Sequence, residues 1–167
     1  GVPYATYAGG MLPSATSAGD VYFAAASDGK AVYATGIERG GGDKPRPNTP
    51  VVYKITLPDR KAATAFFGDP KTVGNARAPL SYPHWLAVDG AGHVLAADRN
   101  NNRVLVIGEK SGKLIGSIRV PSPTWVGVHR KTGAVYVRSG GSIVKFAGVK
   151  NAREVSRLTL PKLPDRI

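Results

Sequence analysis

The sequence predicts an all-β protein made of about three repeats, each of four short antiparallel strands. The chain of 167 residues contains 21 Gly and 13 Pro, which is typical of many short strands joined by turns. Trp125 follows Trp85 at an interval of about 40 residues, and similar apolar segments recur around both. Four strands in about 40 residues is the size of one β-propeller blade. A single blade cannot bury both of its faces, so the repeats are expected to stack side by side.

The middle repeat, residues 80–121, shows this pattern most clearly. Gly90 and Gly92 form its first turn, because glycine tolerates the positive φ that a tight hairpin turn requires. The polar segment 99–102 makes the second turn. The predicted strands are 83–88, 93–98, 103–107 and 113–120.

Two further repeats follow the same scheme. The third repeat, residues 122–161, begins its first strand with Trp125 and turns at Gly140 and Gly141. The first repeat, residues 19–68, is longer because it contains an insertion at 38–50, which is expected to project as a loop. The predicted strands of these two repeats are 22–26, 31–35, 51–57, 63–67, 123–128, 134–137, 142–146 and 154–160.

The middle repeat resembles the NHL repeat in detail. Its segments Pro83–Val88 and Ala97–Val104 are similar to the two NHL elements, Pro-x-Gly-hydrophobic-Ala-Val-Asp and Ala-Asp-x-x-Asn-x-Arg-hydrophobic, with Trp85 in place of the usual Gly. Residues 123–161 and 19–68 share the spacing more than the motif. The resemblance implies a propeller that serves as a binding platform for protein or RNA.

The resemblance also implies an incomplete ring. NHL propellers usually have six blades, and three blades cannot close a ring. The remaining blades are therefore expected from the same longer chain or from another chain, because open edge strands disfavour an isolated monomer. Residues 1–18 are expected to be the remnant of a preceding blade or an N-terminal extension, and 162–167 a linker to a following blade.

A second resemblance suggests candidate catalytic residues. The middle repeat is similar to propellers of the peptidyl-α-hydroxyglycine α-amidating lyase type, in which a Pro-His element supplies a zinc ligand and the Arg of an Ala-Asp-Arg turn acts on the substrate. Pro83-His84 and Asp98-Arg99 match these elements. The resemblance implies His84 as a metal ligand for zinc or calcium, and His84 with Arg99 as catalytic residues. Zinc catalysis needs about three protein ligands, and the equivalent places in the other repeats hold Thr124 and Val21.

The polar turn of the middle repeat has two interpretations. Asp98, Arg99, Asn100 and Arg103 could line an active site, with Arg103 as a ligand-binding residue. Alternatively, the aspartate accepts hydrogen bonds from turn N–H groups, and an arginine pairs with an adjacent blade.

An aromatic residue begins the first strand of each repeat. These residues are Tyr22, Trp85 and Trp125. First strands are innermost in a propeller, so the three rings are candidates to line a channel mouth and to stack on a sugar, a base or an aromatic group. The alternative is that the rings pack between blades.

The charge favours a binding function. The net charge of +12 attracts anionic partners, and nucleic acid is among them. Zero Cys excludes disulfides and thiolate chemistry, and no apolar run is long enough to span a membrane. The leading prediction is a non-catalytic NHL-type module that binds a partner through a basic face and an aromatic channel mouth. The alternatives are a metal-dependent lyase or hydrolase that uses His84 and Arg99, and a structural subunit of an extracellular assembly. A secreted bacterial protein, extracellular or periplasmic, is the expected setting.

Overall fold

A computed structural model describes most of the three repeats. The described residues are 21–27, 29–37, 50–57, 64–69, 79–81 and 83–161, with the side chains of 21–27, 36 and 37 excepted. The flanking segments 1–18 and 162–167 lie outside them, as does the expected insertion at 38–50 apart from Pro50.

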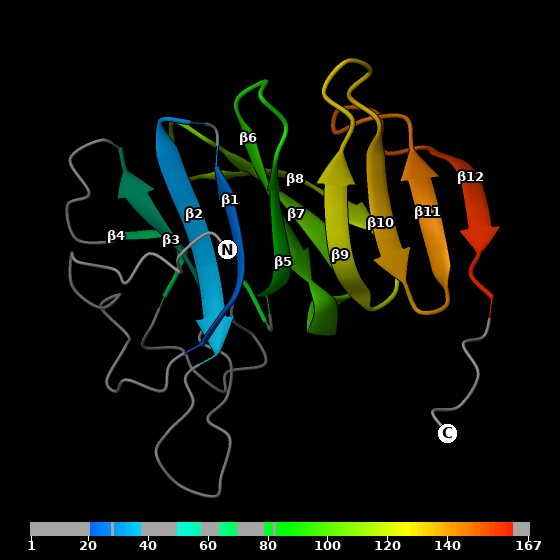
Figure 1. Ribbon diagram of the computed structural model, residues 1–167, viewed down its shortest axis with the longest axis horizontal. Helices are drawn as coiled ribbons and strands as arrows, with labels where there is room; N and C mark the ends of the chain where they lie inside the picture. Colours follow the sequence, from blue (N-terminus) through cyan, green and yellow to red (C-terminus); the bar gives the residue numbers. More distant parts are fainter. Residues whose placement is uncertain are drawn as a thin grey trace, which may run out of the picture.

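Three four-stranded antiparallel sheets form this part of the chain, and we call them blades 1, 2 and 3 (Figure 1). Blade 1 consists of β1 (Val21–Ser27), β2 (Ala31–Ile37), β3 (Val51–Thr56) and β4 (Thr64–Gly68). Blade 2 consists of β5 (Pro83–Val88), β6 (His93–Asp98), the 3-10 helix η2 (Arg99–Asn101), β7 (Arg103–Gly108) and β8 (Leu114–Arg119). Blade 3 consists of β9 (Pro123–Val128), β10 (Val135–Ser139), β11 (Ser142–Phe146) and β12 (Glu154–Thr159). The predicted all-β fold of four-stranded blades is confirmed.

The blades are arranged as in a propeller. Within each sheet the strands are neighbours in chain order. The first strand of blade 2, β5, lies beside both β1 and β9, so the first strands of all three blades share one side of the molecule (Figure 1). The last strands, β4, β8 and β12, form the opposite edges of their sheets.

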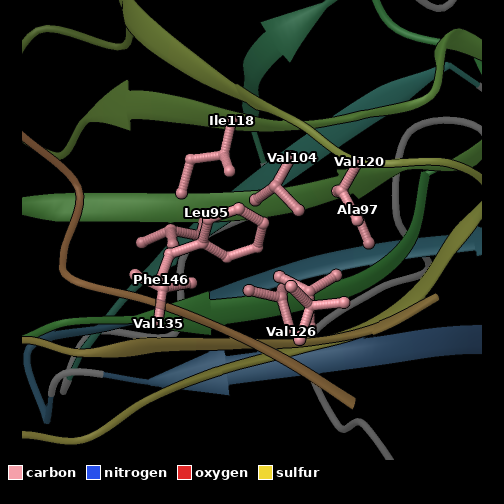
Figure 2. Packing of buried hydrophobic residues seen from close by; sticks show 10 residues of the cluster. Leu95, Ala97, Val104, Ile118, Val120, Val126, Val135 and Phe146 are labelled. Atoms are coloured by element: carbon pink, nitrogen blue, oxygen red, sulfur yellow. The ribbon is translucent and has the colours of Figure 1, made fainter. Parts of the chain in front are cut away.

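Two apolar clusters fill the spaces between neighbouring blades. Tyr33 and Val52 of blade 1 pack against Leu86, Ala96 and other residues of blade 2. Leu95, Ala97, Val104, Ile118 and Val120 of blade 2 pack against Val126, Val135, Val137, Val144 and Phe146 of blade 3 (Figure 2). Blade 2 therefore contributes both of its faces to the core, whereas blade 3 contributes one.

The burial of individual strands follows from these positions. Residues 104–107 of β7 are all buried, because this strand is central in the blade that lies between two others. In β11 the buried residues are Val144 and Phe146, which point toward blade 2. Every residue of β12 is exposed. Among the described residues, no helix is long and apolar enough to cross a membrane.

Candidate partner-binding surface

Asp98 organises the end of the blades at which the chain passes from one blade to the next. This connector end includes residues 79–81, 99–102, 120–122 and 140–141. The Asp98 carboxylate is fully buried. It accepts hydrogen bonds from the backbone N–H of Ser81 at 2.7 Å, from Asn101 Nδ2 at 2.8 Å and from Arg103 Nε at 2.9 Å. One carboxylate thus joins the incoming connector to the turn after β6.

Asn102 connects the same turn to the outgoing connector. Its φ of 53° lies in the left-handed region, which Asn adopts more readily than most residues. The Asn102 Oδ1 atom accepts from the N–H of Ser122 at 2.8 Å, and its carbonyl oxygen accepts from the N–H of Val120 at 3.1 Å. The Asp-Arg-Asn-Asn-Asn-Arg element therefore fixes both connectors of blade 2.

Blade 3 has a smaller version of this arrangement. Ser139 ends β10 as Asp98 ends β6, and its Oγ donates to the carbonyl oxygen of Pro121 at 2.7 Å. A hydroxyl makes one contact with the incoming connector where the carboxylate makes several. The absence of the Asp-Arg-Asn motif from the third repeat is thus compatible with the same connector path.

The two arginines of the polar turn have different environments. Arg103 forms a salt bridge with Asp98, and its Nη2 donates to the carbonyl oxygen of Pro79 at 2.7 Å. One contact is within blade 2 and the other is with the connector that leads into it, and neither is with a strand of a neighbouring blade. Arg99 lies in η2 and is exposed. The geometry brings Asp98 and Arg103 together in a structural contact and places Arg99 at the surface.

His84 spans the boundary between blades 2 and 3. Its Nδ1 lies 2.9 Å from the carbonyl oxygen of Thr124. A carbonyl oxygen can only accept, so Nδ1 carries the proton and donates. Thr124 occupies the place in β9 that His84 occupies in β5, and it contributes its main chain to this contact.

The zinc site implied by the second resemblance is not formed by the described residues. They contain no group of three His, Cys, Asp or Glu side chains placed to hold a metal. At the place equivalent to His84, blade 3 presents a threonine, which is not a usual zinc ligand. The donor set on the described part of the chain therefore does not fit zinc, and we assign no catalytic step to His84.

We predict that His84→Ala weakens the packing of blade 3 against blade 2. Loss of one interblade hydrogen bond is expected to lower the free energy of unfolding by about 1 kcal/mol. Urea unfolding followed by far-UV circular dichroism measures this change. His129→Ala is the control, because His129 is exposed and its Nδ1 contacts Thr132 within a single turn. Equal effects of the two substitutions would contradict the interblade role.

The two tryptophans are half-exposed and hold the same place in adjacent strands. Trp85 and Trp125 are each the third residue of their strand, and each has 37% of its surface exposed. The Trp125 ring lies over Gly127, where an added Cβ would meet Cη2 at 2.5 Å. Both rings therefore retain surface that a ligand or another protein segment can contact.

The register aligns a different residue of β1 with these tryptophans. Trp125 pairs with Arg138, two residues beyond the cross-strand pair Tyr136–Lys145. In blade 1 the corresponding pair is Tyr33–Lys54, and two residues beyond Tyr33 is Thr35, which pairs with Ala24. Tyr22 pairs instead with Gly36, before a register shift in β1. The sequence alignment of Tyr22 with the two tryptophans missed this bulge, and the Tyr22 side chain lies outside the described residues.

The opposite end of the blades, which we call the hairpin end, is strongly basic. It consists of the turns between β5 and β6, β7 and β8, β9 and β10, and β11 and β12, and the last two stand at the top of Figure 1. Six exposed cations lie on the last three of these turns, two on each: Lys110, Lys113, Arg130, Lys131, Lys150 and Arg153. In the described part of the chain, none of the six takes part in a salt bridge.

The acidic side chains near this end are engaged locally. Asp89 is buried and accepts from the N–H groups of Ala91 and His93, at 2.7 and 3.0 Å, as well as contacting the His93 ring. Glu154 accepts from Arg157 and raises the pKa of that guanidinium through the hydrogen bond. The six cations therefore present a positive surface that these carboxylates do not neutralise.

A cavity of about 480 Å³ opens at the hairpin end between blades 1 and 2. Three lysines, Lys30, Lys54 and Lys110, line it together with Glu109, Ser111 and small residues. The Lys54 ammonium lies 5.5 Å from the centroid of the Tyr33 ring and 5.6 Å from that of Phe66. This cavity could not be predicted from the sequence, because its lysines lie far apart in the chain.

Comparison with known proteins supports the propeller interpretation. Residues 80–107 match the NHL repeat model. No curated protein matches the chain in sequence. The chain is similar in structure to Kuenenia stuttgartiensis hydrazine synthase, with a TM-score of 0.59 and 14% identity, over 95% of this chain and 39% of that one.

Two other solved structures show the same likeness. Myxococcus xanthus glutaminyl cyclase has a TM-score of 0.55 and 12% identity, over 84% of this chain and 53% of that one. The structure of U3-55K has a TM-score of 0.61 and 12% identity, over 86% of this chain and 40% of that one. The chain thus spans between 39% and 53% of the length of these proteins, and at such identities the likeness concerns the fold alone. The chain is a β-propeller segment of three blades, and its middle blade carries an NHL repeat.

Proposed function

We propose that this chain is a non-catalytic NHL-type propeller module that binds an anionic partner through its hairpin end. The observation that carries the proposal is the group of six exposed cations on three neighbouring turns, none of them in a salt bridge with a described residue. The cavity beside them, lined by three lysines, offers a place for an acidic group of the partner. Partner recognition through turns on a rigid sheet scaffold is common in such folds.

The proposal predicts binding that weakens as salt rises. Each partner charge that meets a lysine or arginine adds a screened attraction, and a polyanion also releases counterions. Two fluorescent probes test this: a polyglutamate peptide and a single-stranded RNA oligonucleotide, titrated by anisotropy at several salt concentrations. At least one probe is expected to bind with an affinity that falls steeply between low and physiological salt. Affinity independent of salt for both probes would refute an electrostatic binding end.

Charge reversal on the turn between β9 and β10 locates the surface. We expect Arg130→Glu with Lys131→Glu to lower affinity for the bound probe about tenfold at low salt, and by less at high salt. Arg119→Glu is the control, because Arg119 is an exposed cation at the connector end of β8. Its effect is expected to stay below about twofold. A similar loss in both proteins would show that net charge, and not the hairpin end, governs binding.

A further inference from the structure

A cross-strand pair of tyrosine and lysine occurs on the same face of blades 1 and 3. In blade 1, Tyr33 of β2 pairs with Lys54 of β3, and Lys54 Nζ lies 5.5 Å from the Tyr33 ring centroid. In blade 3, Tyr136 of β10 pairs with Lys145 of β11, and Lys145 Nζ lies 5.8 Å from the Tyr136 ring centroid. Both pairs belong to central strands. Tyr33 is on the face of blade 1 that packs against blade 2, and Tyr136 is on the face of blade 3 that points away from blade 2.

Blade 2 covers the pair in blade 1. Tyr33 is fully buried there, at a ring-centroid distance of 5.0 Å from Phe66. Its hydroxyl donates to Oε1 of Glu109 at 3.3 Å. Glu109 belongs to the turn between β7 and β8 of blade 2, so a carboxylate from the following blade bonds the tyrosine of the pair, and Lys54 lines the same cavity as that carboxylate. Apolar residues of blade 2, including Leu86 and Leu105, complete the interface.

The corresponding face of blade 3 is open. Leu158 pairs with Ile143 as Ile118 of blade 2 pairs with Val104. Ile118 is 1% exposed beneath blade 3, whereas Leu158 is 64% exposed. We call this surface the blade-3 face, and its members are Trp125, Tyr136, Arg138, Ile143, Lys145 and Leu158.

The chemistry of the blade-3 face selects an acidic occupant. Tyr136 and Lys145 reproduce the pair of blade 1, in which the tyrosine hydroxyl bonds Glu109. Arg138, at the position held by Thr35 in blade 1, adds a second cation to the face. A covering sheet must therefore bring apolar side chains for Ile143 and Leu158 and at least one carboxylate for the cations, because burying them unpaired is costly.

A second copy of this chain does not offer the matching surface. Glu109 is already bonded to Tyr33 within the chain. The far face of blade 1, with Ala34, Val51 and Tyr53, is buried to 5% exposure or less. We infer that the blade-3 face docks a further four-stranded blade, distinct from these three, whose turn between the third and fourth strands presents a carboxylate to Tyr136 and Lys145.

An extended chain tests this inference. A copy of residues 82–121 is joined after Pro161 in place of 162–167. One residue then separates Pro161 from the copied Pro83, just as Ser122 separates Pro121 from Pro123. The copy supplies a blade 2 whose Glu109 and apolar face already pack against a Tyr-Lys pair in blade 1. The extended protein is expected to melt in one transition, about 5 °C above the full chain of 167 residues. A separate transition of the added copy, or its failure to become ordered, overturns the inference.

Substitutions in the extended chain test the carboxylate contact itself. Tyr136→Phe in blade 3 and Glu109→Gln in the added copy are each expected to remove about 2 °C of the gain in melting temperature. The double variant is expected to lose no more than the larger of the two single losses. Lys110→Gln in the added copy is the control, with no shift. Additive losses, or a loss with the control, overturn the contact. Light scattering of the full chain tests the alternative occupant, because a dimer that Arg138→Glu dissociates would assign the face to a second copy instead.

Discussion

Asp98→Ala is expected to lower the free energy of unfolding by about 3 kcal/mol, a large fraction of the stability of a domain this size. The carboxylate is fully buried and accepts from Ser81, Asn101 and Arg103. Removing it leaves the Ser81 N–H, Asn101 Nδ2 and Arg103 Nε without this acceptor, while Arg103 Nη2 keeps its bond to the Pro79 carbonyl oxygen. A donor that loses its only partner costs about 1–3 kcal/mol. Urea unfolding, followed by circular dichroism and by tryptophan fluorescence, measures the loss.

Two comparisons separate the role of Asp98 from a general effect of substitution. Asp98→Asn keeps one acceptor oxygen and the volume of the side chain, so we expect about half of the loss. Ser139→Ala removes the corresponding contact in blade 3, a single hydrogen bond to the Pro121 carbonyl oxygen, and is expected to cost about 1 kcal/mol. Should Asp98→Ala cost no more than Ser139→Ala, the carboxylate does not fix the connector of blade 2.

The turn glycines and the spacing of the two tryptophans show why the fold was predictable from the sequence. Tight turns demand glycine at positive φ, and Gly90, Gly92 and Gly133 have φ values of 73°, 93° and 71°. Those positions divide the chain into strands before any packing is known. The interval between Trp85 and Trp125 then sets the length of a blade. Local chemistry and a repeated spacing were sufficient for the architecture because each blade contacts only its neighbours.

The candidate surface was less predictable because it depends on register and on contacts between blades. A bulge in β1 places Tyr22 at a different register position from the tryptophans, and a bulge cannot be recognised from the composition of a strand. The cavity at the hairpin end gathers Lys30, Lys54 and Lys110 from two blades. The Tyr136–Lys145 pair was detectable only by comparison with Tyr33–Lys54 once the strands had been paired. Sequence spacing is sufficient to identify the strands, whereas the residues that share one face of a sheet are known only once the pairing of the strands is known.

Gly68→Ala is the second substitution with a large expected effect, about 3 kcal/mol of lost stability. Gly68 ends β4 opposite Val51 and has a φ of 91°, a conformation that side chains rarely adopt. A Cβ at this position would lie 2.1 Å from the carbonyl oxygen of Pro50 and 3.2 Å from the Cα of Val51. Because these atoms are backbone, relief requires movement of β3 against β4 and not a change of rotamer.

Substitutions at two other glycines separate the contribution of backbone strain from that of the steric clash at Gly68. Gly29 has a similar φ of 89° but nothing within 4 Å of an added Cβ, so Gly29→Ala reports backbone strain alone and is expected to cost about 1 kcal/mol. Gly116 of β8 has neither feature, and Gly116→Ala is expected to change stability by less than about 0.5 kcal/mol. Chemical unfolding of the three variants under one set of conditions gives the series. If Gly68→Ala costs no more than Gly29→Ala, the β3–β4 edge yields without loss, and blade 1 does not depend on the close approach of Gly68 to Pro50.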